Sequence, residues 1–298
     1  MTNAVTFKWV KDQALCAGAK THADLGVEPV RSNLSSDCRG FQPHKVLQIM
    51  IDGDQIWRKA DLLWMEGLQE ALMISFIAAF AVFLLLHSIP AIPAVRAGVI
   101  SQVGKPVYLI SYSVVSIAAL VWLFSAALSL DYVPLWDLRP WHAAAAFVLA
   151  PLGGFLVLAG LFSENPLSVA VRSSERSGAV VQVTRHPVLW GFAIWASGHI
   201  VANGDLRSLL LFGGFALFAL AAIPMAEKRA RRRLGGRWRA LSEGTSIVPL
   251  ARLFSWRRPR VDPPMLLAAA LTAGISCWLL LGDGHATLFG ADPIAVLG

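Results

Sequence analysis

The chain alternates long apolar blocks with short polar and basic segments. Most blocks approach the roughly 20 residues that an α-helix needs to cross about 30 Å of hydrocarbon. Blocks of this length are typical of a multi-pass membrane protein rather than of amphipathic surface helices. The pattern predicts an all-α, multi-pass transmembrane helix bundle of about six spans, at residues 69–88, 107–130, 142–162, 187–202, 206–226 and 264–281.

The fourth block is the shortest, so a re-entrant or tilted arrangement stays open for residues 187–202. The sequence "NGD" at 203–205 predicts a tight turn into the fifth block, because glycine supplies the backbone freedom. Prolines in "SIPAIP" and "ENP" are expected to end the first and third helices, since proline cannot continue the hydrogen-bond ladder.

Composition supports a membrane protein: 56% of the 298 residues are hydrophobic and only 15% are charged. A soluble domain carries about 25% charged residues. The three cysteines, Cys16, Cys38 and Cys277, form no CxxC pair and no even framework. They therefore support neither a zinc site nor a disulfide scaffold.

Residues 1–64 form a polar extension of mixed charge that lacks the pattern of a cleavable signal peptide. We expect this extension to be disordered or to lie upstream of the native start, for which Met65 is a candidate. The remaining divisions are a membrane domain over 65–230, a basic segment over 231–263 and an additional span with a tail over 264–298.

Lysine and arginine concentrate in the loops 89–106, 163–186 and 227–263, which alternation of the spans places on one side of the membrane. The loops on the other side carry only Arg139 and Arg207. The positive-inside rule therefore predicts that the basic loops are cytoplasmic, as expected in a bacterial inner membrane. This distribution explains the net charge of +7 without a nucleic-acid partner. Only the extension, with Arg58 and Lys59, conflicts, and a start at Met65 removes the conflict.

The histidines separate by membrane depth. His186 and His199 are thirteen residues apart in one predicted helix, about 20 Å along its axis, so they cannot ligate one metal together. His87 and His186 are instead expected at one level. Two histidines from different helices at one depth suit the two axial ligands of a haem iron, and Arg96 and Arg185 at the same interface suit the propionates.

Structural roles compete with these assignments. Histidine near the end of a span often bonds a backbone carbonyl, and we take His142 and His285 as interfacial. Trp136, Trp141 and Trp190 suit the aromatic belt of a membrane protein. The run "EKRARRRLGGRWR" is most simply an anchor against anionic lipid. Asp205 is a candidate for fixing the ring of His199.

Three separated blocks resemble the NnrU family of bacterial integral membrane proteins: "LHSIPAIPAVR", "YVPLWDLRPW" and "RHPVLWGFAIWASGHIVANGDLRSLLLFGGFALFAL". The resemblance covers roughly residues 67–230. The family is named after denitrification gene neighbourhoods, and its biochemical role is poorly defined.

The same domain is similar to plant zeta-carotene isomerase, a haem b protein that converts a double bond from cis to trans. This resemblance implies that His87 and His186 ligate haem iron and act catalytically. His199 matches a further histidine of the family motif and is included with Arg96 and Arg185 among the cofactor-binding candidates.

A second resemblance competes. "RHPxxxG", followed by Glu227, Trp238 and Pro249, is similar to the isoprenylcysteine and phospholipid methyltransferases. In those enzymes the histidine and a glutamate serve the S-adenosylmethionine and acceptor pocket. Here a single Glu227 followed by basic residues replaces their usual paired glutamates.

Three hypotheses follow. The first is a haem b protein acting on a lipophilic polyene, or in redox or nitrogen-oxide sensing, with a redox partner. The second is an S-adenosylmethionine-dependent transferase using His186 and Glu227. The third is a non-enzymatic accessory protein of a respiratory complex.

Overall fold

The computed structural model describes residues 43–170, 176–251 and 260–295. The chain divides into two units, residues 1–71 and 72–298, and every contact discussed below lies within the second. Most of the predicted polar extension, with Cys16 and Cys38, lies outside the described residues. Residues 43–64, at the end of the extension, are helical. They form one continuous helix, α2 (Pro43–Ser88), with the first predicted span.

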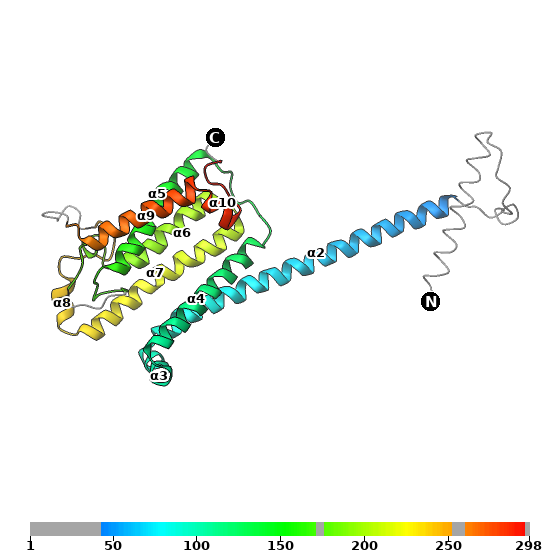
Figure 1. Cartoon of the computed structure of the whole chain (residues 1–298). Coiled ribbons are helices and arrows are strands. Elements are labelled where there is room, and N and C mark those ends of the chain that lie inside the picture. Colours follow the sequence, from blue (N-terminus) through cyan, green and yellow to red (C-terminus); the bar gives the residue numbers. More distant parts are fainter. Residues whose placement is uncertain (1–42, 171–175, 252–259, 296–298) are drawn as a thin grey trace. The chain divides into compact units, whose positions relative to one another are not determined.

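The predicted all-α multi-pass bundle is confirmed. Five described helices are long and apolar enough to cross a membrane: Trp64–Ser88 within α2, α4 (Lys105–Leu128), α5 (Pro140–Phe162), α7 (Leu206–Leu234) and α9 (Pro263–Leu281). The fourth predicted span is α6 (Pro187–Asn203), whose 17 residues make it the shortest of these helices, about 26 Å at 1.5 Å per residue. It packs between α5 and α7, while α9 lies beside α5 (Figure 1).

Three shorter helices were not expected. The segment after the first span is a 3-10 turn at Ile89–Ala91 followed by α3 (Pro93–Val103), and the chain later forms α8 (Arg237–Ser242) and α10 (Gly284–Phe289). The prolines of "SIPAIP" end α2 as predicted. Pro93 also starts α3, because a proline at the first helical position loses no hydrogen bond.

Two buried clusters hold the second unit together. The first is aromatic and joins α2, α4, α6 and α7 through residues that include Phe76, Phe83, Leu123, Phe212 and Phe215. The second joins α5 and α9 to the loop after α5 through residues that include Leu156, Leu167, Val180 and Ala268. Burying these apolar side chains fixes how the helices pack.

Helices α5 and α6 approach each other through glycines. A Cβ atom added to Gly153 would lie 2.6 Å from the Gly191 carbonyl oxygen, and one added to Gly191 would lie 2.7 Å from the Gly153 carbonyl oxygen. Only a residue without a side chain permits this backbone contact. The short α6 is therefore seated closely against α5.

The predicted turn between α6 and α7 is confirmed. Gly204 has φ +66°, in the left-handed region that favours glycine. The buried Asp205 caps α7 by accepting a hydrogen bond from the Ser208 backbone N–H at 3.0 Å. Its carboxylate also lies 3.5 Å from Arg207 Nε. The suggestion that Asp205 fixes His199 is wrong, because the His199 ring bonds the Trp195 carbonyl instead.

Candidate functional site

The sequence "TRHP" at 184–187 forms the entry to α6. Pro187 is the first residue of α6, and His186 precedes it in a non-helical conformation with φ −122° and ψ 60°. A residue before proline is disfavoured in the helical region, so the helix begins at Pro187. Thr184 fixes the approach: its hydroxyl donates to the Ile247 carbonyl at 2.8 Å and accepts from the His186 backbone N–H at 3.3 Å.

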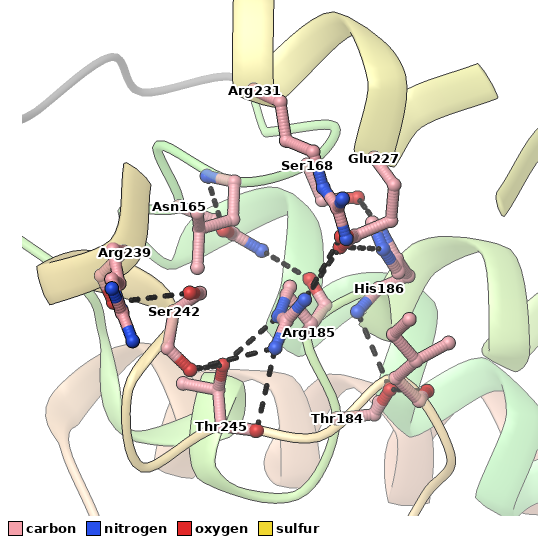
Figure 2. Close-up of polar contacts among 12 residues, drawn as sticks. Asn165, Ser168, Thr184, Arg185, His186, Glu227, Arg231, Arg239, Ser242 and Thr245 are labelled. Carbon is pink, nitrogen blue, oxygen red and sulfur yellow. Dashed lines mark hydrogen bonds and ion pairs between the residues drawn. The ribbon is translucent and has the colours of Figure 1, made fainter. Parts of the chain in front are cut away.

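Arg185 is buried, and its guanidinium is fully engaged within the protein. Nη1 donates to both oxygens of Glu227 at 2.9 Å, and Nε donates to the Thr245 hydroxyl at 3.0 Å (Figure 2). Nη2 lies 3.4 Å from each of the carbonyl oxygens of Ser242 and Thr245. A buried arginine with these partners is neutralised in place rather than offered to a ligand.

His186 is completely buried, and both of its ring nitrogens have partners. Nε2 lies 2.9 Å from Glu227 Oε1, and Nδ1 lies 2.8 Å from the Ser168 hydroxyl (Figure 2). A carboxylate accepts, so Nε2 carries the proton and Nδ1 accepts from Ser168. Burial lowers the pKa of His186, and the hydrogen bond to Glu227 opposes that shift. The ring is therefore neutral near neutral pH.

Glu227 lies on the inward face of α7 and joins these groups. It is 6% exposed and accepts hydrogen bonds from Arg185 and His186, while Arg231 Nη2, one helical turn later, lies 3.7 Å from Oε2. The Arg231 guanidinium also stacks on Trp238, 4.2 Å from the ring centroid. The carboxylate thus has three cationic or hydrogen-donating neighbours, which stabilises its charge in a buried position.

The chain after α8 folds back over this cluster. The Arg185 backbone N–H donates to the Ser246 carbonyl at 2.7 Å, and the Leu250 N–H donates to the Val183 carbonyl at 2.9 Å. Trp190 Nε1 donates to the Ile247 carbonyl at 2.8 Å. Beside this fold-back, an open cavity of about 490 Å³ is lined by Gly236, Arg239, Ala240, Ser242 and Glu243. The "RHP" motif, Glu227 and the segment ending in "VP" therefore meet at one place.

His87 lies elsewhere, near the end of α2 in the aromatic cluster. Its ring is half-buried, 4.2 Å from the Phe83 ring centroid and 6.2 Å from that of Tyr112. Its Nδ1 lies 2.8 Å from the Phe83 carbonyl oxygen one turn earlier. A carbonyl only accepts, so Nδ1 carries the proton and the Nε2 lone pair has no hydrogen-bond partner within the described residues.

His199 on α6 has the same arrangement. Its Nδ1 donates to the Trp195 carbonyl at 2.9 Å, again one turn earlier, and its half-buried ring stacks on Phe212 with 4.7 Å between centroids. The Phe212 ring belongs to the same aromatic cluster as Phe83. Its Nε2 likewise has no hydrogen-bond partner in the described part of the chain.

The family described as NnrU protein matches residues 75–293, which contain the aromatic cluster and the Arg185, His186 and Glu227 site. The chain belongs to the NnrU family. No curated protein and no solved structure matches it. The NnrU match reaches residue 293 and so includes α9 and α10, which the motif resemblance over roughly 67–230 did not cover.

The structure of this NnrU protein brings some predicted site residues together and leaves others apart. Arg185 and His186 lie at one site with Glu227, which the methyltransferase resemblance singles out and the haem interpretation does not. His87 and His199 lie in the aromatic cluster. Arg96 is exposed on α3, and its side chain has no hydrogen bond or ion pair among the described residues.

Sequence reasoning missed the polar residues that complete the His186 site. Ser168 and Thr245 come from loops, Ser242 is the last residue of α8, and Asn165 donates to the Arg185 carbonyl at 3.1 Å. Serines and threonines in loops have no spacing that distinguishes a site residue from a turn residue. The sequence signal for this site is an arginine and a glutamate placed at the ends of apolar spans, because a charged residue at membrane depth requires a partner.

Haem iron is ligated by a histidine ring nitrogen that carries no proton and has no other partner. His87 and His199 fit an axial ligand, since each has its Nδ1–H fixed by a carbonyl and an Nε2 lone pair available. His186 does not fit in this arrangement, because both of its nitrogens are bonded. Arg185 is likewise bound to Glu227 rather than available to a propionate.

Proposed function

We propose that this NnrU protein binds haem b within the membrane and has a redox-dependent role. The observation that carries the proposal is the matched pair of half-buried histidines, His87 and His199, whose Nε2 lone pairs have no hydrogen-bond partner among the described residues. A histidine that ligates metal almost always fixes its other nitrogen through a hydrogen bond, as both rings do here.

His87 is the first ligand in this proposal, in agreement with the resemblance to zeta-carotene isomerase. His199 is favoured as the second ligand over His186, which would have to give up Ser168 or Glu227 before binding iron. His199 stacks on Phe212, and Phe218 contacts the Phe83 ring beside His87. These two phenylalanines are six residues apart on α7, about 9 Å along its axis. Both histidines therefore contact the aromatic cluster but at different levels of α7, and the proposal requires α2 and α6 to bring the two rings to one depth before a single iron binds both.

When bound, haem would supply an iron centre that exchanges electrons and activates small ligands or a polyene. The residues around it hold the imidazoles and exclude water: the Phe83 and Trp195 carbonyls orient the rings, and the phenylalanines of the cluster provide an apolar wall. The substrate class in this proposal is a lipophilic polyene that undergoes cis-to-trans isomerisation. A redox or nitrogen-oxide role linked to denitrification is the alternative use of the same centre. A bacterial inner membrane and an electron-donating partner are part of the proposal.

A second candidate function is S-adenosylmethionine-dependent methyl transfer. It is favoured by the meeting of His186, Glu227 and the fold-back segment beside the open cavity, although they are separated along the sequence. Against it, the Glu227 carboxylate is already shared among Arg185, His186 and Arg231. The cavity also lies next to Arg239 and Glu243 rather than against the His186 ring.

The experiment is a haem assay on the full chain, expressed with ample haem and purified in detergent. We expect about one haem b per chain by pyridine haemochromogen absorption, because the proposal places one pair of axial ligands in each chain. A colourless protein under these conditions would sink the haem proposal. Calorimetric binding of S-adenosylmethionine, abolished in Glu227→Gln, would then support methyl transfer, and absence of both would support the accessory role.

A further inference from the structure

The cations at the end of α7 divide into two groups. Arg231 and Arg233 point back to the protein: Arg231 contacts Glu227 and Trp238, and Arg233 donates to the Pro166 carbonyl. Lys228, Arg229 and Arg232 are exposed, and their side chains have no hydrogen bond or ion pair among the residues that the structure describes. The last two turns of α7 therefore carry two arginines whose side chains contact the protein and an outward group of three cations whose side chains form no such contact with the described residues.

The outward group forms one compact face. At about 100° per residue, Lys228, Arg229 and Arg232 fall within an arc of about 100° around the helix. Residues three and four positions apart on a helix have Cβ atoms roughly 5–6 Å apart, so these three like charges repel one another. The nearest carboxylate on α7, Glu227, lies on the inward face and is shared with Arg185 and His186. An anion from outside the chain would relieve this repulsion.

The outward group of cations follows directly on an exposed apolar surface of α7. Leu217, Ala221 and Met225 follow one another at helical spacing directly before the cations, and all three are exposed, Leu217 to 71% and Met225 to 50%. On a helix apolar enough to cross a membrane, such residues contact acyl chains. Lys228 comes three residues after Met225, about 4.5 Å along the axis. The cations therefore lie where acyl chains give way to headgroups.

We propose that Lys228, Arg229 and Arg232 bind the phosphate of an anionic phospholipid in the leaflet where α7 ends. Charge complementarity favours a phosphate, and continuity with the acyl-facing residues favours a lipid over a soluble polyanion. The site is independent of haem binding, because none of its residues contacts the aromatic cluster around His87 and His199.

The test compares thermal unfolding of the full chain in nanodiscs of phosphatidylcholine with unfolding in nanodiscs that also contain phosphatidylglycerol. We expect phosphatidylglycerol to raise the unfolding midpoint of the wild type. The triple variant Lys228→Gln, Arg229→Gln, Arg232→Gln should lose that rise while keeping the wild-type midpoint in phosphatidylcholine, since these side chains are exposed. The charge-retaining variant Lys228→Arg, Arg229→Lys, Arg232→Lys should keep it.

A matched control removes three other exposed cations, Arg96, Lys105 and Arg239, by substitution with glutamine. It should keep the phosphatidylglycerol effect; an equal loss would attribute the effect to net charge and overturn the proposal. The proposal is also overturned if the first triple variant keeps the full rise, or if inorganic phosphate in phosphatidylcholine discs reproduces it. The proposal is overturned as well if phosphatidylglycerol leaves the unfolding midpoint of the wild type unchanged.

Discussion

Glu227 is the single carboxylate on which the buried Arg185 and His186 both depend. Substitution by glutamine keeps the shape but removes the charge, so Arg185 is left buried without a counter-ion. Breaking a buried ion pair in this way costs about 3–5 kcal/mol. We therefore expect Glu227→Gln to lower the unfolding midpoint of the detergent-solubilised protein strongly. Glu243→Gln, at an exposed position, is the matched control and should leave the midpoint close to wild type.

His186 makes the stability of the folded chain depend on pH. Burial lowers its pKa in the folded state below the ordinary value of 6.5. Between that lowered pKa and 6.5 the unfolded chain binds the extra proton and the folded chain does not, so the free energy of unfolding falls as pH falls. We expect the wild type to lose more stability from pH 7 to pH 5 than His186→Gln does. Equal losses in the two proteins, measured by thermal unfolding across that range, would contradict this assignment.

The sequence identified the chemically distinctive residues but not their pairing. Arg185, His186 and His87 were recognised because polar residues are costly in an apolar chain, and alternation of the spans placed His87 and His186 at one depth. Depth alone does not determine which way a side chain faces around its helix. The rotation of α7 brings Glu227 to His186, while His87 faces Phe83 and Tyr112. That rotation is set by tertiary packing.

At the scale of elements, the contact between α5 and α6 depends on glycines. An alanine at Gly191 would place a Cβ atom 2.7 Å from both the Gly153 carbonyl oxygen and the Val157 backbone nitrogen, which are backbone atoms that cannot move alone. Overpacking of this kind typically costs about 1–3 kcal/mol. We expect Gly191→Ala to lower the unfolding midpoint. Gly274→Ala on α9, where nothing lies within 4 Å, should be neutral or stabilising, and similar losses in both would contradict this account.

Helix positions were largely predictable, and helix ends were less so. The blocks at 107–130 and 142–162 correspond to α4 and α5, because hydropathy and length suffice for a span. α7 continues to Leu234, eight residues beyond the predicted span, because arginine and lysine are good helix formers even outside the membrane. α3 was missed because its prolines were interpreted only as helix breakers.

At the scale of the whole molecule, the second unit separates two kinds of chemistry. The site of Arg185, His186 and Glu227 lies at the entry of α6, where loops close over buried charges. The aromatic cluster of α2, α4, α6 and α7 holds His87 and His199 among apolar rings. The imidazoles with available Nε2 lone pairs thus lie in the apolar region, where the proposed haem would be held.

The most direct test of the haem proposal is the absorption spectrum of the full chain beside three variants of equal type: His87→Ala, His199→Ala and His186→Ala. The account predicts a Soret band in the wild type that is lost or strongly shifted in the first two variants. In His186→Ala the Soret position should be unchanged in whatever folded protein is recovered, because His186 is engaged with Ser168 and Glu227. A Soret band that disappears with His186 and survives the loss of His199 would contradict the account.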